Sequence, residues 1–130
     1  MSPPHQPAKP APAVLIIDDE VTLARNLAAY LRRVGYDVRT AACAEEGLAT
    51  LADFLPAIVL CDHDLPGMNG LEAMREIRQR HGTLVRVVMV SGSSSHALAA
   101  AALQAGAAHF LTKPVALADV RLLLERLVGG

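Results

Sequence analysis

The chain of 130 residues contains no tryptophan and only two cysteines, two phenylalanines and two tyrosines. With so few aromatic side chains, any core must be aliphatic, and hydrophobic residues indeed make up 52% of the sequence. Two cysteines cannot supply the dense disulfide framework of small secreted domains. Cys61 ends an apolar run, where a thiol usually behaves as a small buried hydrophobe. We therefore expect a reduced, cytoplasmic protein.

Long hydrophobic segments and an excess of one charge are also absent. The apolar runs fall well short of the ~20 residues that a membrane span needs, and the N-terminus lacks the apolar segment of a secretory signal. The formal net charge is −1, whereas nucleic-acid-binding domains usually carry a basic patch. We therefore expect one globular domain without a membrane span and without direct nucleic-acid contact.

Proline is concentrated at the start of the chain. Residues 1–13 hold five of the eight prolines, and such a segment favours extended conformations that cannot bury a core. The composition predicts a flexible tail or linker over 1–13, ahead of a domain over 14–128. A linker to another domain and a disordered end without function both fit it.

Strand and helix patterns alternate five times after the proline-rich segment. Strands are predicted at 14–18, 36–41, 57–61, 85–90 and 108–111, and helices at 20–34, 44–54, 70–81, 95–105 and 116–127. The third strand is continuously apolar, which is typical of a strand covered on both faces, whereas the second alternates like an edge strand. Right-handed crossovers between parallel strands leave few topologies. The pattern predicts an α/β protein with one open parallel sheet between two helix layers.

Five polar residues follow or close the apolar strands: Asp18, Asp19, Asp62, Ser91 and Lys113. In open parallel sheets, ligands bind in the crevice outside the carboxyl ends of the strands. All five side chains should therefore meet at one edge of the sheet. Three carboxylates, a hydroxyl and an ammonium group together indicate a site for a divalent cation and a phosphoryl group.

Asp62 is the candidate nucleophile, because a carboxylate can accept a phosphoryl group and form an acyl phosphate. The two further carboxylates require a cation, and Mg²⁺ is commonly bound through one or two carboxylates and phosphate oxygens. Lys113 offers a positive charge to Asp62 and to the phosphoryl group, and Ser91 offers a hydroxyl donor. The Lys113–Pro114 peptide bond is a candidate for the cis form.

Each of these residues also has a structural explanation when it is taken alone. An acidic pair after a strand often caps a helix, a serine before glycine often forms a turn, and a single lysine is usually solvated. The specific signal is the combination, because the polar residues follow the first, third, fourth and fifth strands.

At this point the chain closely resembles the receiver domain of bacterial two-component response regulators. The matching segments are 14–20, 59–70, 90–92 and 110–114, in the order and spacing of that family, and the resemblance covers residues 14–127. It implies a flavodoxin-like (βα)5 three-layer sandwich with strand order 2-1-3-4-5, which agrees with the edge-like second strand.

The resemblance also implies a phosphorylation-activated signalling switch rather than an enzyme acting on a separate substrate. Asp62 would accept a phosphoryl group from a phosphohistidine of a sensor histidine kinase or phosphotransfer protein. The implied Mg²⁺ ligands are Asp18, Asp19, Asp62 and the backbone carbonyl of Asp64.

In the same family, the residues at the positions of Ser91 and Lys113 bind the phosphoryl oxygens. Ser91 and the aromatic residue at the position of Phe110 also change position on activation. These movements alter the face made by the fourth helix, fifth strand and fifth helix, which controls an unknown output domain or partner and is a possible homodimer interface.

Three residues depart from the usual family pattern. Gly92 stands where alanine is common and frees the loop, and Phe110 replaces the more usual tyrosine, so that a hydroxyl contact is lost. Asp64 adds a carboxylate beside the phosphorylation site. Because positions 64 and 93 tune acyl-phosphate hydrolysis in the family, we expect Asp64 and Ser93 to set the phosphate lifetime.

The predicted fourth helix is nearly all alanine, which favours helix but buries little area, so this helix should be well formed and loosely held. A mobile signalling element and a thin helix beside small neighbours both fit.

Two alternatives to a working switch remain at this stage. Asp62 and Asp64 mimic the nucleophile and acid/base pair of a haloacid-dehalogenase-like phosphatase, but that family's nucleophile follows the first strand and its substrate cap has no room here. The other is a degenerate receiver that only binds partners, against which the intact set of five site residues argues.

Overall fold

The computed structural model describes residues 11–129. Its strands are β1 (Ala13–Ile17), β2 (Asp37–Ala41), β3 (Ile58–Asp62), β4 (Arg86–Ser91) and β5 (His109–Thr112). Its helices are α1 (Val21–Arg33), α2 (Ala44–Thr50), α3 (Gly70–His81), α4 (His96–Gln104) and α5 (Leu117–Gly129). The five predicted βα units are thus confirmed, while most of the predicted tail over 1–13 lies outside the described residues.

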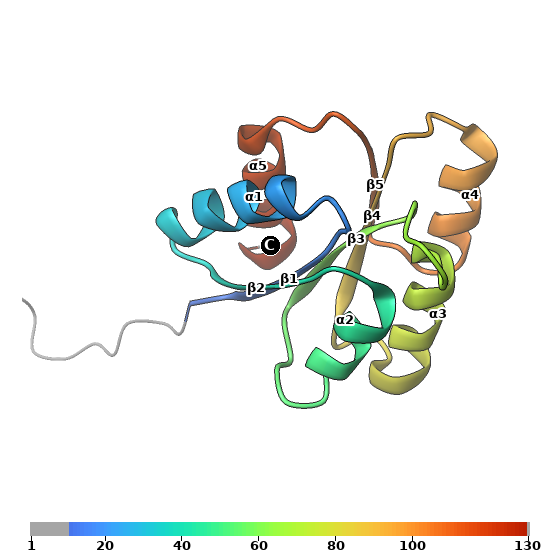
Figure 1. The fold of residues 1–130 in the computed structure, drawn as a ribbon, viewed down its shortest axis with the longest axis horizontal. Coiled ribbons are helices and arrows are strands. Elements are labelled where there is room, and N and C mark those ends of the chain that lie inside the picture. The colour runs from blue at the N-terminus through green and yellow to red at the C-terminus, as the bar shows by residue number, and fades with distance from the viewer. Residues whose placement is uncertain (1–10, 130) are drawn as a thin grey trace, which may run out of the picture.

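The strands form one parallel sheet in the order β2-β1-β3-β4-β5, which confirms the expected order. Helices α1 and α5 cover one face of this sheet, and α2, α3 and α4 cover the other (Figure 1). All strands run in the same direction, so their carboxyl ends lie along one edge of the sheet.

Two aliphatic cores lie on the two faces of the sheet, and β1 contributes to both. Successive strand residues point to opposite faces. Leu15 and Ile17 accordingly pack with the α2 and α3 core, and Val14 and Ile16 pack with the α1 and α5 core. Strand β3 is buried along its whole length, as its continuously apolar sequence predicts. The central strands are therefore fixed from both sides, which fixes the residues at their ends.

Helix α2 is shorter than predicted, because it ends at Thr50 rather than 54. Residues 51–53 form a turn in which the Phe54 N–H donates to the Thr50 carbonyl oxygen at 3.1 Å. Leu55 precedes a proline, and this position disfavours helical backbone. Of the apolar positions that predicted the longer helix, Leu51 is buried in the turn, whereas Leu55 is 54% exposed.

Helix α4 buries a single residue, Ala102, and its Leu103 side chain is 51% exposed. This confirms the prediction that the alanine-rich helix brings little area into the core. The neighbouring β5 is one of the two edge strands and has no fully buried residue. Within residues 11–129, no helix is long and apolar enough to cross a membrane.

Candidate functional site

Four of the predicted site residues reach the carboxyl edge of the sheet from four different strands. Asp18 follows β1, Asp62 ends β3, Ser91 ends β4 and Lys113 follows β5. In the described part of the chain, Asp18, Asp62 and Ser91 are the polar or charged residues classed as buried, and Asp62 is only 3% exposed. Burial of polar side chains is costly unless they are paired, so this edge is a built polar site.

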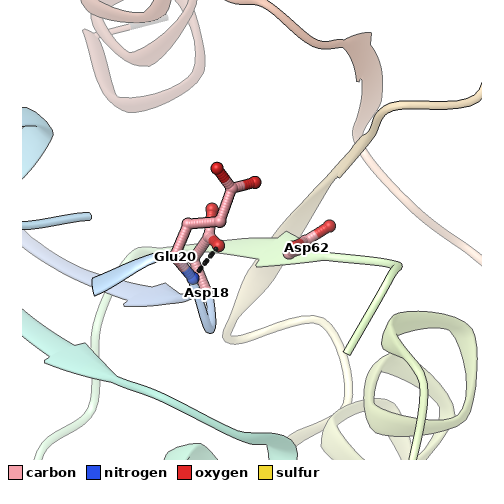
Figure 2. Close-up of side chains that lie close together, drawn as sticks. All are labelled: Asp18, Glu20 and Asp62. Carbon is pink, nitrogen blue, oxygen red and sulfur yellow. Dashed lines mark hydrogen bonds between the residues drawn. The ribbon is translucent and has the colours of Figure 1, made fainter. Parts of the chain in front are cut away.

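Lys113 stands at the centre of the site and makes three ion pairs. Its Nζ lies 3.0 Å from Asp18 Oδ2, 3.3 Å from Asp62 Oδ2 and 2.9 Å from Glu20 Oε1. Figure 2 shows that the side chains of Asp18 and Glu20, which follow β1, lie close to that of Asp62 at the end of β3. One ammonium group thus balances part of the charge of three carboxylates.

The three carboxylates also form the group that could hold a metal ion. Asp18, Glu20 and Asp62 each offer one oxygen, and these oxygens lie within 4.8 Å of one another. Sequence reasoning missed Glu20, although it directly follows the acidic pair in the matched segment 14–20. Asp19, which was expected as a ligand, is exposed and is not part of this group.

The turn after β1 brings the side chains of Asp18 and Glu20 close to that of Asp62. The backbone N–H of Glu20 donates to Asp18 Oδ1 at 2.9 Å, as Figure 2 shows. This side chain-to-backbone bond stabilises a turn in which Asp18 and Glu20 contribute oxygens to the same group.

Asp64 links the loop after β3 to the loop after β4. Its backbone N–H donates to Asp62 Oδ1 at 3.0 Å. Its side-chain Oδ2 accepts from the Ser91 hydroxyl and from the Gly92 backbone N–H, both at 3.1 Å. The Ser91 hydroxyl oxygen in turn accepts from the Ser93 N–H at 3.0 Å. Sequence reasoning placed all five residues near the site but did not predict these contacts.

Burial is the main reason why the pKa of Asp62 is raised above its ordinary value, and the neighbouring charge of Asp18 raises it further. The Asp64 N–H and the Lys113 ammonium act in the opposite direction without cancelling this increase. Ionised Asp62 is therefore destabilised in this buried environment, and additional positive charge would stabilise it.

Burial by itself lowers the pKa of Lys113, but hydrogen bonds to Glu20 and Asp18 and the charges of Asp18 and Asp62 outweigh it and raise this pKa. Lys113 is therefore a permanent cation at neutral pH. Burial also raises the pKa of the Cys61 thiol to about 12, with smaller contributions from Asp62 and Asp18. Cys61 remains a protonated core residue and not a nucleophile.

The remaining predicted positions lie around this centre. Phe110 on β5 is partly buried against the core on the α2 and α3 face, and Ser93 is exposed. The Lys113–Pro114 peptide bond is cis, as the sequence allows. An apolar hollow reaches from Asp62 and Lys113 down between α1 and α5, where Leu23 and Leu117 line it.

The fold and this edge define a class of protein: a parallel α/β domain with an acidic site outside its central strands. A family profile described as response regulator receiver domain matches residues 14–125. The chain therefore belongs to the response regulator receiver domain family, a family of signalling domains in two-component systems.

Individual relatives agree with this assignment. The transcriptional activator protein ExaE of Pseudomonas putida is 39% identical over 119 residues, which cover 90% of this chain and 55% of that protein. The chain thus spans about half the length of this curated relative.

Solved structures give the same result. A CheY-like receiver domain protein from Methanospirillum hungatei superposes with a TM-score of 0.84 at 30% identity, over 92% of this chain and 95% of that one. A CheX–CheY–BeF₃–Mg²⁺ complex from Borrelia burgdorferi gives a TM-score of 0.84 at 28% identity, over 90% of this chain and 89% of that one.

Proposed function

We propose that this domain is a cytoplasmic switch in which Asp62 accepts a phosphoryl group from the phosphohistidine of a sensor histidine kinase or a phosphotransfer protein. The observation that carries the proposal is the position of Asp62. Its carboxylate is almost fully buried at the end of a central strand, yet it faces a lysine and two further carboxylates. A structural carboxylate would not require this surplus of negative charge.

The transfer itself requires positioning more than covalent chemistry from the protein. An Asp62 oxygen forms a bond to phosphorus while the bond between phosphorus and the donor's imidazole nitrogen breaks, and that nitrogen then takes up a proton. The new group has three terminal oxygens that share its negative charge. Lys113, the Ser91 hydroxyl and the Gly92 N–H are the nearby donors that these oxygens would use.

The donor set fits Mg²⁺. It consists of carboxylate oxygens close enough to share one ion, and Mg²⁺ binds such oxygens together with phosphate oxygens. When it is bound, Mg²⁺ neutralises charge that develops on the transferred group. We propose Asp18, Asp62 and the backbone carbonyl of Asp64 as ligands, with Asp19 or Glu20 as the third carboxylate.

The side of the site formed by α1 and α5 suits the approach of the phosphodonor protein. Val21 is 50% exposed and Leu23 is 45% exposed on the first turns of α1, and Leu117 of α5 lines the same hollow beside Asp62. Exposed apolar side chains beside a reactive group are typical of a partner surface. The donor's imidazole would thus be presented next to Asp62.

The side of the site formed by β4 and β5 is the route to the output. Ser91 and Phe110 connect the site to the face made by α4, β5 and α5, where α4 and β5 are the least buried elements. We propose that this face changes on phosphorylation and contacts an output domain, a partner or a second copy. DNA binding by an attached domain is compatible with the transcriptional relative.

The first test is intact-mass spectrometry after incubation with acetyl phosphate. We expect one added phosphoryl group that requires Mg²⁺, is absent in Asp62→Asn and is retained in Asp53→Asn, a matched control at an exposed carboxylate away from the site. A folded protein that gains no mass would indicate a degenerate receiver. Rapid consumption of acetyl phosphate without accumulation of the phosphorylated form would instead indicate a phosphatase.

A second test assigns the third carboxylate. Isothermal titration calorimetry measures Mg²⁺ binding to wild type, Asp19→Asn and Glu20→Gln. Only one of the two variants should lose at least tenfold in affinity. Equal affinities in all three proteins would exclude both residues as ligands.

A further inference from the structure

The carboxylate of Asp64 holds two of the donors that a phosphoryl group on Asp62 would need. One oxygen, Oδ2, accepts from the Ser91 hydroxyl and from the Gly92 N–H. Ser91 is completely buried at the end of β4, and β4 pairs with β3 so that Val90 lies opposite Asp62. Both donors therefore stand one strand away from the proposed phosphorylation site.

A hydroxyl group has one proton and donates one strong hydrogen bond at a time. While the Ser91 hydroxyl donates to Asp64, it cannot donate to an oxygen bound to Asp62. The Gly92 N–H also has a single proton, which points at the same carboxylate oxygen. Asp64 resembles the incoming group, since both are anions with oxygen acceptors.

We propose that Asp64 is an internal competitor of the phosphoryl group, an autoinhibitory latch that keeps Ser91 and Gly92 engaged until phosphorylation displaces it. This inference rests on the proposed function of Asp62. It assigns to Asp64 a role beyond that of tuning hydrolysis, because the latch acts on the equilibrium between the resting and the switched arrangement.

The latch connects to α4 through a series of serines. The Ser93 N–H donates to Ser91 Oγ at 3.0 Å, and the Ser95 N–H donates to Ser93 Oγ at 3.2 Å. Ser95 Oγ then accepts from the Leu98 N–H at 3.3 Å, which caps the first turn of α4. A Ser91 hydroxyl that turns from Asp64 toward Asp62 shifts the first acceptor of this series. Release of the latch therefore loosens the start of α4.

A negative charge at position 64 would also weaken the binding of any anion by simple repulsion, so an experiment must distinguish the effect of the hydrogen bonds from that of the charge. Removal of the Ser91 hydroxyl makes this distinction. If Asp64 acts by holding the Ser91 hydroxyl, removal of Asp64 has less effect when that hydroxyl is already gone. If it acts by charge alone, its removal has the same effect in both backgrounds.

The experiment titrates beryllofluoride, a mimic of the phosphoryl group, into the full chain with Mg²⁺ and follows backbone amide signals by NMR. Wild type, Asp64→Ala, Ser91→Ala and the double variant form a cycle. Asp64→Ala should bind beryllofluoride about tenfold more tightly than wild type, the scale of one hydrogen bond to a charged group. In the Ser91→Ala background, the same change should give less than about threefold. Glu46→Gln, which removes an exposed charge beside Asp18, is the control and should give less than about twofold.

The Gly92 amide signal gives a second measurement that does not depend on Ser91→Ala. The chemical shift of this signal should differ between free wild type and free Asp64→Ala. At saturating beryllofluoride the two shifts should become the same, because the mimic has replaced the carboxylate. An equal tightening in both Ser91 backgrounds, unchanged or weaker binding by Asp64→Ala, or a Gly92 difference that persists at saturation would each overturn the latch. If wild type itself does not bind beryllofluoride with Mg²⁺, the proposed function fails rather than the latch alone.

Discussion

Helices α3 and α4 follow neighbouring strands and begin beside the same crevice, but they are attached to the sheet differently. Helix α3 buries Ala73, Met74 and Ile77, and Asn69 and Glu72 form a capping box at its start. Helix α4 buries only Ala102, and its cap is the single side chain of Ser95. Phosphorylation of Asp62 would occur between a firmly anchored helix and a weakly anchored one, so the weaker helix is the one expected to respond.

Core anchoring gives the largest expected difference between the two helices. Met74 is completely buried, and Met74→Ala should lower the free energy of unfolding by about 3 kcal/mol, because it removes contacts and leaves a cavity. Leu103→Ala on α4 is the matched control and should change this free energy by less than about 0.5 kcal/mol. Urea denaturation measures both, and similar losses would contradict the contrast in anchoring.

Alanine substitutions of Gly70, the first residue of α3, and Gly92, in the loop before α4, should also differ in their effect on stability. A Cβ at position 70 would lie 2.5 Å from the Asp62 carbonyl oxygen and 2.6 Å from the His63 Cα, so backbone must move. Gly70→Ala should therefore cost about 2 kcal/mol of stability. A Cβ at position 92 meets Asp64 Oδ2 at 3.7 Å, an ordinary contact, and Gly92→Ala should cost less than about 0.5 kcal/mol. A tolerated Gly70→Ala would show that the α3 entrance is not tightly packed.

The stability of the protein should depend on pH, because ionisation of Asp62 is unfavourable in the folded state. Because the folded protein raises the pKa of Asp62 above its ordinary 3.8, charging this carboxyl disfavours folding as the pH rises through that range. Without Mg²⁺, Asp62→Asn should therefore be more stable than wild type at pH 7, and the difference should disappear toward pH 3. Thermal unfolding across this range measures it, and a variant less stable at pH 7 would reverse the sign.

The smallest expected effect concerns the helix caps. Asn69→Ala should cost about 1 kcal/mol of global stability, the usual contribution of an N-cap. Ser95→Ala should cost only about 0.5 kcal/mol globally, because α4 can open locally while the sheet stays folded. The main effect of Ser95→Ala should be faster amide hydrogen exchange in α4. Equal global losses would indicate that α4 unfolds together with the core.

Several parts of this fold follow from local sequence. The predicted range 70–81 coincides with α3, since Asn69 supplies a cap at its start and Gly82 follows its last residue. The end of α2 was predicted too late, because Leu51 and Leu55 continue the apolar spacing of Leu48 while the backbone already turns after Thr50. The strand order required the family resemblance, since the alternation of elements and right-handed crossovers still leave more than one parallel order open.

The site was predictable where a residue's strand end determines its position. Asp18, Asp62, Ser91 and Lys113 come together for this reason. Glu20 and the contacts of Asp64 were not predictable, because they depend on loop turns and side-chain rotamers that only the folded backbone sets. Asp19 is exposed and outside the group of three carboxylates, and its role as a Mg²⁺ ligand stays a prediction.

The most direct test of this account compares deuterium uptake by mass spectrometry before and after phosphorylation with acetyl phosphate and Mg²⁺. We predict a change in uptake over His96–Gln104 and none over Gly70–His81, although both helices follow strands that end at the site. An equal change in both helices, a change confined to α3, or no change in fully phosphorylated protein would contradict it.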